Sequence, residues 1–159
     1  MVYDYMLQRL ESAPLGHRSR YNNNINIDGR RPYMDDNFDN LKVMIIDDSK
    51  TIRRTAETLL KKVGCEVITA TDGFDALAKI ADTHPNIIFV DIMMPRLDGY
   101  QTCALIKNNS KFKDTPVIML SSKDGLFDKA KGRIVGSDQY LTKPFSKDEL
   151  LGAIRNFVK

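Results

Sequence analysis

Residues 86–91 read NIIFVD, an apolar run that ends in the carboxylate of Asp91. β-Branched and aromatic residues without polar alternation are typical of a strand buried on both faces, as in parallel sheets. A carboxylate at the last position of such a strand lies at the sheet edge where open α/β folds place their ligands. The plainer interpretation is an aspartate that ends a strand and begins a turn, so the rest of the chain must decide.

Apolar runs separated by helical spacing recur on both sides of this stretch. Helix limits are marked by Ser49 as an N-cap, by Gly64 and His84-Pro85 as stops, and by a capping box that begins at Ser146. This alternation predicts an α/β fold, a flavodoxin-like doubly wound (βα)5 parallel sheet with strand order 2-1-3-4-5. The four further strands are predicted at 41–46, 66–70, 117–120 and 138–142.

The first 40 residues differ in character from the rest of the chain. They contain polar runs such as Asn22-Asn23-Asn24 and Arg30-Arg31-Pro32, and such a composition does not bury enough apolar surface to become ordered. We therefore predict a mostly disordered extension over 1–40 and one domain over 41–159. Met34 is a candidate internal start, which would make residues 1–33 an upstream read-through or an artificial extension.

Charge and composition exclude several classes of protein. The net charge of +3 is spread along the chain and does not indicate a nucleic-acid partner. No apolar run is long enough for membrane insertion, and the first residues lack a secretory signal. Cys65 and Cys103 lack metal-binding spacing, which favours reduced thiols and a cytoplasmic location.

Polar side chains end four of the five predicted strands. Right-handed crossovers bring Asp47, Asp48, Asp91, Ser121 and Lys143 to one edge of the sheet. Clustered carboxylates raise one another's pKa unless a cation neutralises them, and Mg²⁺ prefers such oxygens together with phosphate. An aspartate can attack phosphorus, a lysine can bind phosphoryl oxygens, and a serine can donate a hydrogen bond.

Each of these residues also has a purely structural interpretation. The Asp47-Asp48 pair could cap a helix, Ser121 could be a turn residue, and Lys143-Pro144-Phe145 could be a plain loop. Their joint occurrence on the matching strands favours a phosphate and magnesium site.

With these motifs in place, residues 41–158 resemble the response-regulator receiver domains of two-component systems, close to the single-domain (CheY-like) chemotaxis regulator. The resemblance rests on five motifs: Asp47-Asp48, Asp91-Ile92-Met93-Met94-Pro95, Asp98-Gly99, Ser121-Ser122 and Lys143-Pro144-Phe145. Residues 48–54, DSKTIRR, are most similar to single-domain regulators of type IV pilus twitching motility.

The resemblance implies a role for each site residue. Asp91 is expected to accept a phosphoryl group from a histidine kinase. Asp47, Asp48, Asp91 and the backbone carbonyl of Met93 are expected to hold Mg²⁺, and Lys143 to bind the phosphate.

The resemblance also implies a conformational switch. Ser121 takes the switch hydroxyl position and Tyr140 the switch aromatic position, and the Lys143–Pro144 peptide bond is expected to be cis. Phosphorylation would draw Ser121 inward, Tyr140 would follow, and the face formed by the fourth helix and the last strand and helix would change. The fourth helix, 125–135, contains Gly132, which costs about 1 kcal/mol relative to alanine, so it is expected to be mobile.

Two positions depart from the chemotaxis pattern. Met93 and Lys123 stand where polar or acidic side chains often help to position the hydrolytic water. An apolar Met93 does not orient that water, which leads to the hypothesis that the phosphoaspartate decays slowly.

Three functions follow from these expectations. The favoured one is a monomeric regulator, not an enzyme, that binds a pilus-regulating effector protein when phosphorylated. A phosphate sink that drains a kinase is an alternative. A haloacid-dehalogenase-like phosphatase is a remote one, because it would require Asp-x-Asp, whereas Met93 stands two residues after Asp91.

Overall fold

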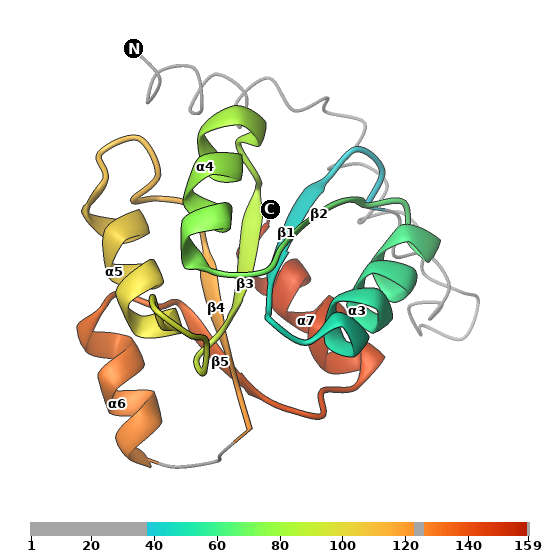
Figure 1. The fold of residues 1–159 in the computed structure, drawn as a ribbon. Coiled ribbons are helices and arrows are strands. Elements are labelled where there is room, and N and C mark those ends of the chain that lie inside the picture. The colour runs from blue at the N-terminus through green and yellow to red at the C-terminus, as the bar shows by residue number, and fades with distance from the viewer. Residues whose placement is uncertain (1–37, 123–125, 159) are drawn as a thin grey trace.

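The structure is a computed structural model that describes residues 38–122 and 126–158. Its centre is a parallel sheet of five strands in the order β2-β1-β3-β4-β5, which confirms the predicted topology (Figure 1). The strands are β1 (Lys42–Ile46), β2 (Glu66–Ala70), β3 (Ile87–Asp91), β4 (Val117–Ser121) and β5 (Gln139–Thr142).

In the described part of the chain, five helices cover the two faces of this sheet (Figure 1). Helices α3 (Lys50–Lys62) and α7 (Lys147–Phe157) lie on one face. Helices α4 (Gly73–Thr83), α5 (Gly99–Asn108) and α6 (Leu126–Ile134) lie on the other. Among the described residues, no helix is long and apolar enough to cross a membrane.

Strand β3 explains why the core divides into two hydrophobic clusters. Its successive side chains point to opposite faces, so Phe89 packs with α3 and α7 while Val90 packs with α4 and α5. All five residues of β3 are buried. The run of apolar residues before Asp91 is therefore a central strand covered on both sides, as its composition predicts.

Side-chain caps begin α3, α4, α5 and α7 at the edge where the parallel strands end. Ser49 caps α3 and Asp72 caps α4, and both accept a hydrogen bond from the backbone within the first turn. Ser146 forms the predicted capping box at the start of α7. Asp98 and Gln101 form a second capping box at the start of α5, which sequence reasoning did not identify.

The packed part of the chain begins earlier than predicted. Phe38 is 3% exposed, lies in the cluster with α3 and α7, and donates its backbone N–H to the Val63 carbonyl. Packing therefore includes a residue that the sequence assigned to the disordered extension. Residues 1–37 of that extension, Met34 among them, lie outside the described residues.

Gly132 has a packing role that its helix propensity does not reveal. A Cβ at this position would lie 2.9 Å from Ser137 Oγ, so the serine hydroxyl would have to move aside. The glycine therefore lets the end of α6 pack directly on the loop before β5. The low helix propensity of Gly132 therefore accompanies a close contact with Ser137. The predicted mobility of α6 stays a prediction.

Candidate functional site

Three carboxylates converge at the edge formed by the ends of β1 and β3. One oxygen from each of Asp47, Asp48 and Asp91 lies within 4.8 Å of the others. Asp47 is fully buried and Asp91 is 3% exposed, whereas Asp48 faces solvent. Because β1 and β3 are neighbours in the sheet, the crowding predicted from the sequence occurs.

Lys143 follows directly after β5 and reaches the cluster from that end of the sheet. Its Nζ lies 2.9 Å from Asp91 Oδ1 and 3.2 Å from Asp47 Oδ2. Burial alone would lower the pKa of Lys143, but hydrogen bonds and charge interactions with Asp91 and Asp47 outweigh it and raise that pKa. The ammonium group is therefore charged at neutral pH and partly neutralises the two buried carboxylates.

Burial also perturbs Asp91. Loss of hydration raises the pKa of its carboxyl to about 6, the negative charge of Asp47 acts in the same direction, and Lys143 opposes both. A carboxyl with this pKa is mostly ionised at pH 7, so it retains the charged form that a nucleophile needs. It is also a group whose charge a bound cation would stabilise.

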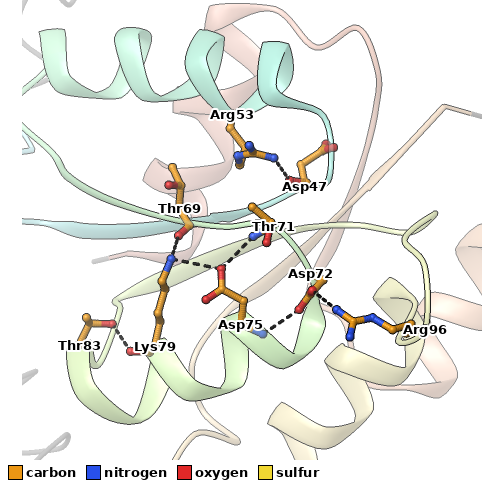
Figure 2. A network of polar contacts seen from close by, with 9 residues as sticks. All are labelled: Asp47, Arg53, Thr69, Thr71, Asp72, Asp75, Lys79, Thr83 and Arg96. Carbon is orange, nitrogen blue, oxygen red and sulfur yellow. Dashed lines mark hydrogen bonds and ion pairs between the residues drawn. The ribbon is translucent and has the colours of Figure 1, made fainter.

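Backbone contacts hold the carboxylates in place. Asp47 Oδ1 accepts the Ser49 N–H at 2.9 Å. The Asp47 carbonyl accepts a hydrogen bond from the Arg53 guanidinium at 2.7 Å (Figure 2). Asp91 Oδ1 accepts the Met93 N–H at 3.4 Å. The hydrogen bond between Arg53 and Asp47 was not predicted, because no motif or spacing in the sequence indicates it.

Gly99 allows α5 to begin directly against the end of β3. A Cβ there would lie 2.3 Å from the Asp91 carbonyl oxygen and 2.7 Å from Ile92 Cα. These neighbours are backbone atoms that cannot move aside independently. The Asp98-Gly99 motif is therefore explained by a cap followed by a position with no room for a side chain.

The donor set fits a single hard divalent cation. Mg²⁺ binds oxygens at about 2.1 Å in an octahedron, so opposite ligands are about 4.2 Å apart. The 4.8 Å limit of the three carboxylates is close to that separation. Of these ligands only Asp48 is exposed, which leaves one open side for water and phosphate oxygens.

Ser121 and Tyr140 lie on adjoining strands. Ser121 ends β4 and is 4% exposed, and Tyr140 pairs with Met119 in the β4–β5 register. Since Met119 and Ser121 are two residues apart, Tyr140 and Ser121 face the same side of the sheet. Tyr140 is partly buried against the cluster that contains Met119.

The remaining predicted positions have different outcomes. Met93 is 71% exposed, so its side chain lies at the open surface beside Asp91. The Lys143–Pro144 peptide bond is cis. Lys123 lies outside the described residues.

Known proteins with this pattern are numerous. Residues 43–155 match the response regulator receiver domain family. The chain is 89% identical over 125 residues to Protein PilG of Pseudomonas aeruginosa, a match that covers 79% of this chain and 93% of that protein. It is 42% identical to a probable transcriptional regulator, ycf27, of Cyanophora paradoxa, covering 74% of this chain but only 48% of that relative.

Solved structures agree with the sequence matches. The chemotaxis protein CheY4 of Vibrio cholerae superposes with a TM-score of 0.72 at 34% identity, covering 74% of this chain and 98% of that one. The receiver domain of Francisella response regulator 1452 superposes with a TM-score of 0.69 at 38% identity, covering 75% and 97%. With its sheet order and its clustered carboxylates, this chain belongs to the response regulator receiver domain family.

Proposed function

We propose that this protein is a single-domain response regulator in which Asp91 accepts a phosphoryl group from a histidine kinase. The observation that carries the proposal is the position of Asp91, buried at a strand end between the lysine ammonium of Lys143 and the carboxylates of Asp47 and Asp48. A strand-ending aspartate with only a structural role would have no need of these neighbours.

The proposed reaction transfers phosphorus between two nucleophiles. A carboxylate oxygen of Asp91 forms a bond to phosphorus while the bond between phosphorus and the kinase histidine nitrogen breaks, and that nitrogen keeps the electron pair and takes up a proton. Lys143, already 2.9 Å from Asp91, would stabilise the charge on the transferring oxygens. Catalysis of this kind is mainly positioning and electrostatics.

Receiver domains bind Mg²⁺ at an acidic pocket, and we propose that Asp47, Asp48, Asp91 and the Met93 carbonyl hold it in this chain. When bound, the ion supplies charge neutralisation for the carboxylates and the incoming phosphate. Asp48, exposed at the rim, is suited to bind through water. Asp47, fully buried and held by Ser49, is suited to fix one direct ligand.

Phosphorylation of Asp91 is proposed to change the surface formed by α6, β5 and α7 through Ser121 and Tyr140. A new phosphate at Asp91 would attract the Ser121 hydroxyl from the neighbouring strand. Tyr140, on the same face and partly buried, would then turn inward and change the surface formed by α6, β5 and α7. This is a population shift between two arrangements, driven by one local charge.

The proposed output is control of type IV pilus twitching motility through an effector protein. The similarity to regulators of that class and the 89% identity to PilG support it. We propose the cytoplasm as its location, because both cysteines are free thiols, as is usual in reducing compartments. Like other receiver domains it is a response regulator rather than a classical enzyme, and self-phosphorylation and self-dephosphorylation are proposed as its only chemistry.

The test is Mg²⁺-dependent labelling with acetyl phosphate, followed by intact-protein mass. Wild type should take up one phosphoryl group and Asp91→Asn none. Asp98→Asn is a matched control, since it removes a carboxylate at the same edge while asparagine still caps α5. Equal labelling of Asp91→Asn and wild type would refute the assignment. A phosphate sink would label normally but show no phosphorylation-dependent partner in pull-down.

A further inference from the structure

The loop between β3 and α5, residues 92–98, contains a backbone conformation that requires support. Arg96 has a φ of 69°, in the left-handed region that residues other than glycine adopt only at an energetic cost. Such a conformation persists only where surrounding contacts fix it. The loop matters because it starts directly after Asp91 and includes Met93, whose N–H bonds to the Asp91 carboxylate.

The side chain of Arg96 makes the contacts that provide this support. One guanidinium nitrogen lies 2.6 Å from Asp72 Oδ2 (Figure 2). The guanidinium carbon lies 5.7 Å from the centre of the Phe74 ring. Both partners belong to the start of α4, which follows β2 at the same sheet edge. Arg96 therefore ties the loop after Asp91 to a separate helix.

Asp72 is shared between two tasks. Its Oδ1 accepts the Asp75 N–H at 2.8 Å as the N-cap of α4, and its Oδ2 binds Arg96. The Asp75 N–H is the main cause that lowers the pKa of the Asp72 carboxyl, and Arg96 lowers it further. Within the described part of the chain, the acidic group suited to a metal ion is Asp47, Asp48 and Asp91, so Asp72 lies outside it.

Packing on either side of Arg96 leaves the loop little freedom. A Cβ on Gly73 would lie 2.6 Å from Leu97 Cδ2 and 2.3 Å from Thr102 Oγ1. The first residue of α4 therefore contacts both the loop and α5 without a gap. Gly99 closes the loop by donating its N–H to the Ile92 carbonyl at 2.9 Å.

We propose that Arg96 is a positioning residue for the divalent-cation site. Its ion pair with Asp72 holds residues 92–98 so that Met93 stays beside Asp91, and the start of α4 thereby sets part of the affinity for the cation. This inference rests on the proposed function, since it assigns a cation to the three carboxylates.

A double-mutant cycle on Mg²⁺ affinity tests it, with Arg96→Asn, Asp72→Asn and the double variant. Asparagine tolerates a positive φ at position 96 and still caps α4 at position 72. Each single variant changes a charge near the site and so alters the Mg²⁺ affinity by itself. The cycle subtracts these two separate effects and leaves the coupling between Arg96 and Asp72. Titration calorimetry with MgCl₂ should give a coupling of about twofold to fivefold, as expected for a partly exposed ion pair.

A second measurement reads the loop without the metal. Amide hydrogen exchange at Gly99 and Leu97 should accelerate in Arg96→Asn. Lys79→Met is the matched control, because it breaks an ion pair with Asp75 on the same helix and should leave exchange at both amides unchanged. Unchanged exchange in Arg96→Asn, or faster exchange with no coupling in the Mg²⁺ cycle, would overturn the inference.

The two proposals fail in distinguishable ways. If wild type binds no Mg²⁺, the proposed function and the cation-positioning role fall together, while faster exchange in Arg96→Asn would still identify the ion pair as the support of the loop. If wild type binds Mg²⁺ and the coupling is within error of zero, only the positioning role falls.

Discussion

Replacing Lys107 by methionine should destabilise the fold far more than its place on a helix suggests. The ammonium group lies 2.8 Å from Asp138 Oδ2, 2.8 Å from the Thr115 carbonyl and 3.2 Å from the Lys113 carbonyl. The side chain is 14% exposed. It therefore joins the end of α5, the approach to β4 and the approach to β5 by three hydrogen bonds from one charge.

The magnitude follows from comparison with a second ion pair. A hydrogen bond to a charged group is worth about 1.5–3 kcal/mol. The three contacts of Lys107 share one ammonium group, and Asp138 is one-third exposed, so we count the three together as one such bond. We expect Lys107→Met to lower the free energy of unfolding by about 2 kcal/mol. Lys61 pairs with Glu57 at 2.7 Å on α3 but is 60% exposed, so Lys61→Met should cost about 0.5 kcal/mol.

Urea unfolding followed by far-ultraviolet circular dichroism measures both variants. With a urea dependence of about 2 kcal/mol per molar, Lys107→Met should lower the midpoint by about 1 M and Lys61→Met by about a quarter of that. Each variant removes one positive charge, so the net charge is matched. Equal midpoints for the two variants would refute the reasoning. The two ion pairs have similar N–O distances, and the exposure of the lysine side chain would then make no difference to their strength.

Three further predictions concern the site and the core. Met93→Asn should shorten the lifetime of the phosphoaspartate several-fold by positioning water, whereas Met93→Leu should not; decay of the label after removal of acetyl phosphate measures it, and equal decay in both would contradict the hypothesis. Burial raises the pKa of Cys65 to about 12 and of Cys103 to about 11, so iodoacetamide should modify neither at pH 8 until urea unfolds the chain. Because unfolded thiols ionise near pH 9 and the folded ones do not, stability should also fall as the pH rises above about 9; labelling of the native protein at the rate of a free thiol would argue against this burial. Gly99→Ala should cost about 1–3 kcal/mol by collision with the backbone at the end of β3, whereas Gly152→Ala in α7, with open space around it, should stabilise by about 0.5–1 kcal/mol; urea midpoints that fail to move in opposite directions would contradict it.

The sheet and the positions of the site residues were predictable because both follow from local pattern. An apolar run such as residues 86–90 specifies a central strand, and the right-handed rule of parallel crossovers places every strand end on one edge. Asp47, Asp91 and Lys143 therefore met where the sequence predicted, although 96 residues separate the first from the last. Predicting that these residues lie close together required only the order of the strands and not the geometry of the side chains.

The contacts that depend on three-dimensional neighbours were not predictable. Lys107 and Asp138 are 31 residues apart, and no periodicity relates them. The positive φ of Arg96 is not a conformation that arginine prefers, and its contacts with Asp72 and Phe74 cannot be read from the sequence. Phe38 was missed because it stands alone in a polar stretch, and a single aromatic residue gives no repeating signal.

Three carboxylates meet at one edge of the sheet, and their mutual repulsion lowers the stability of the folded chain. Each buried like charge disfavours the folded chain, and Lys143 offsets only part of that repulsion. A ligand that binds only the folded form adds stability, about 2.7 kcal/mol at one hundred times its dissociation constant. On the proposed function, the concentration of free magnesium would therefore set the melting temperature of this chain as well as its readiness for phosphorylation.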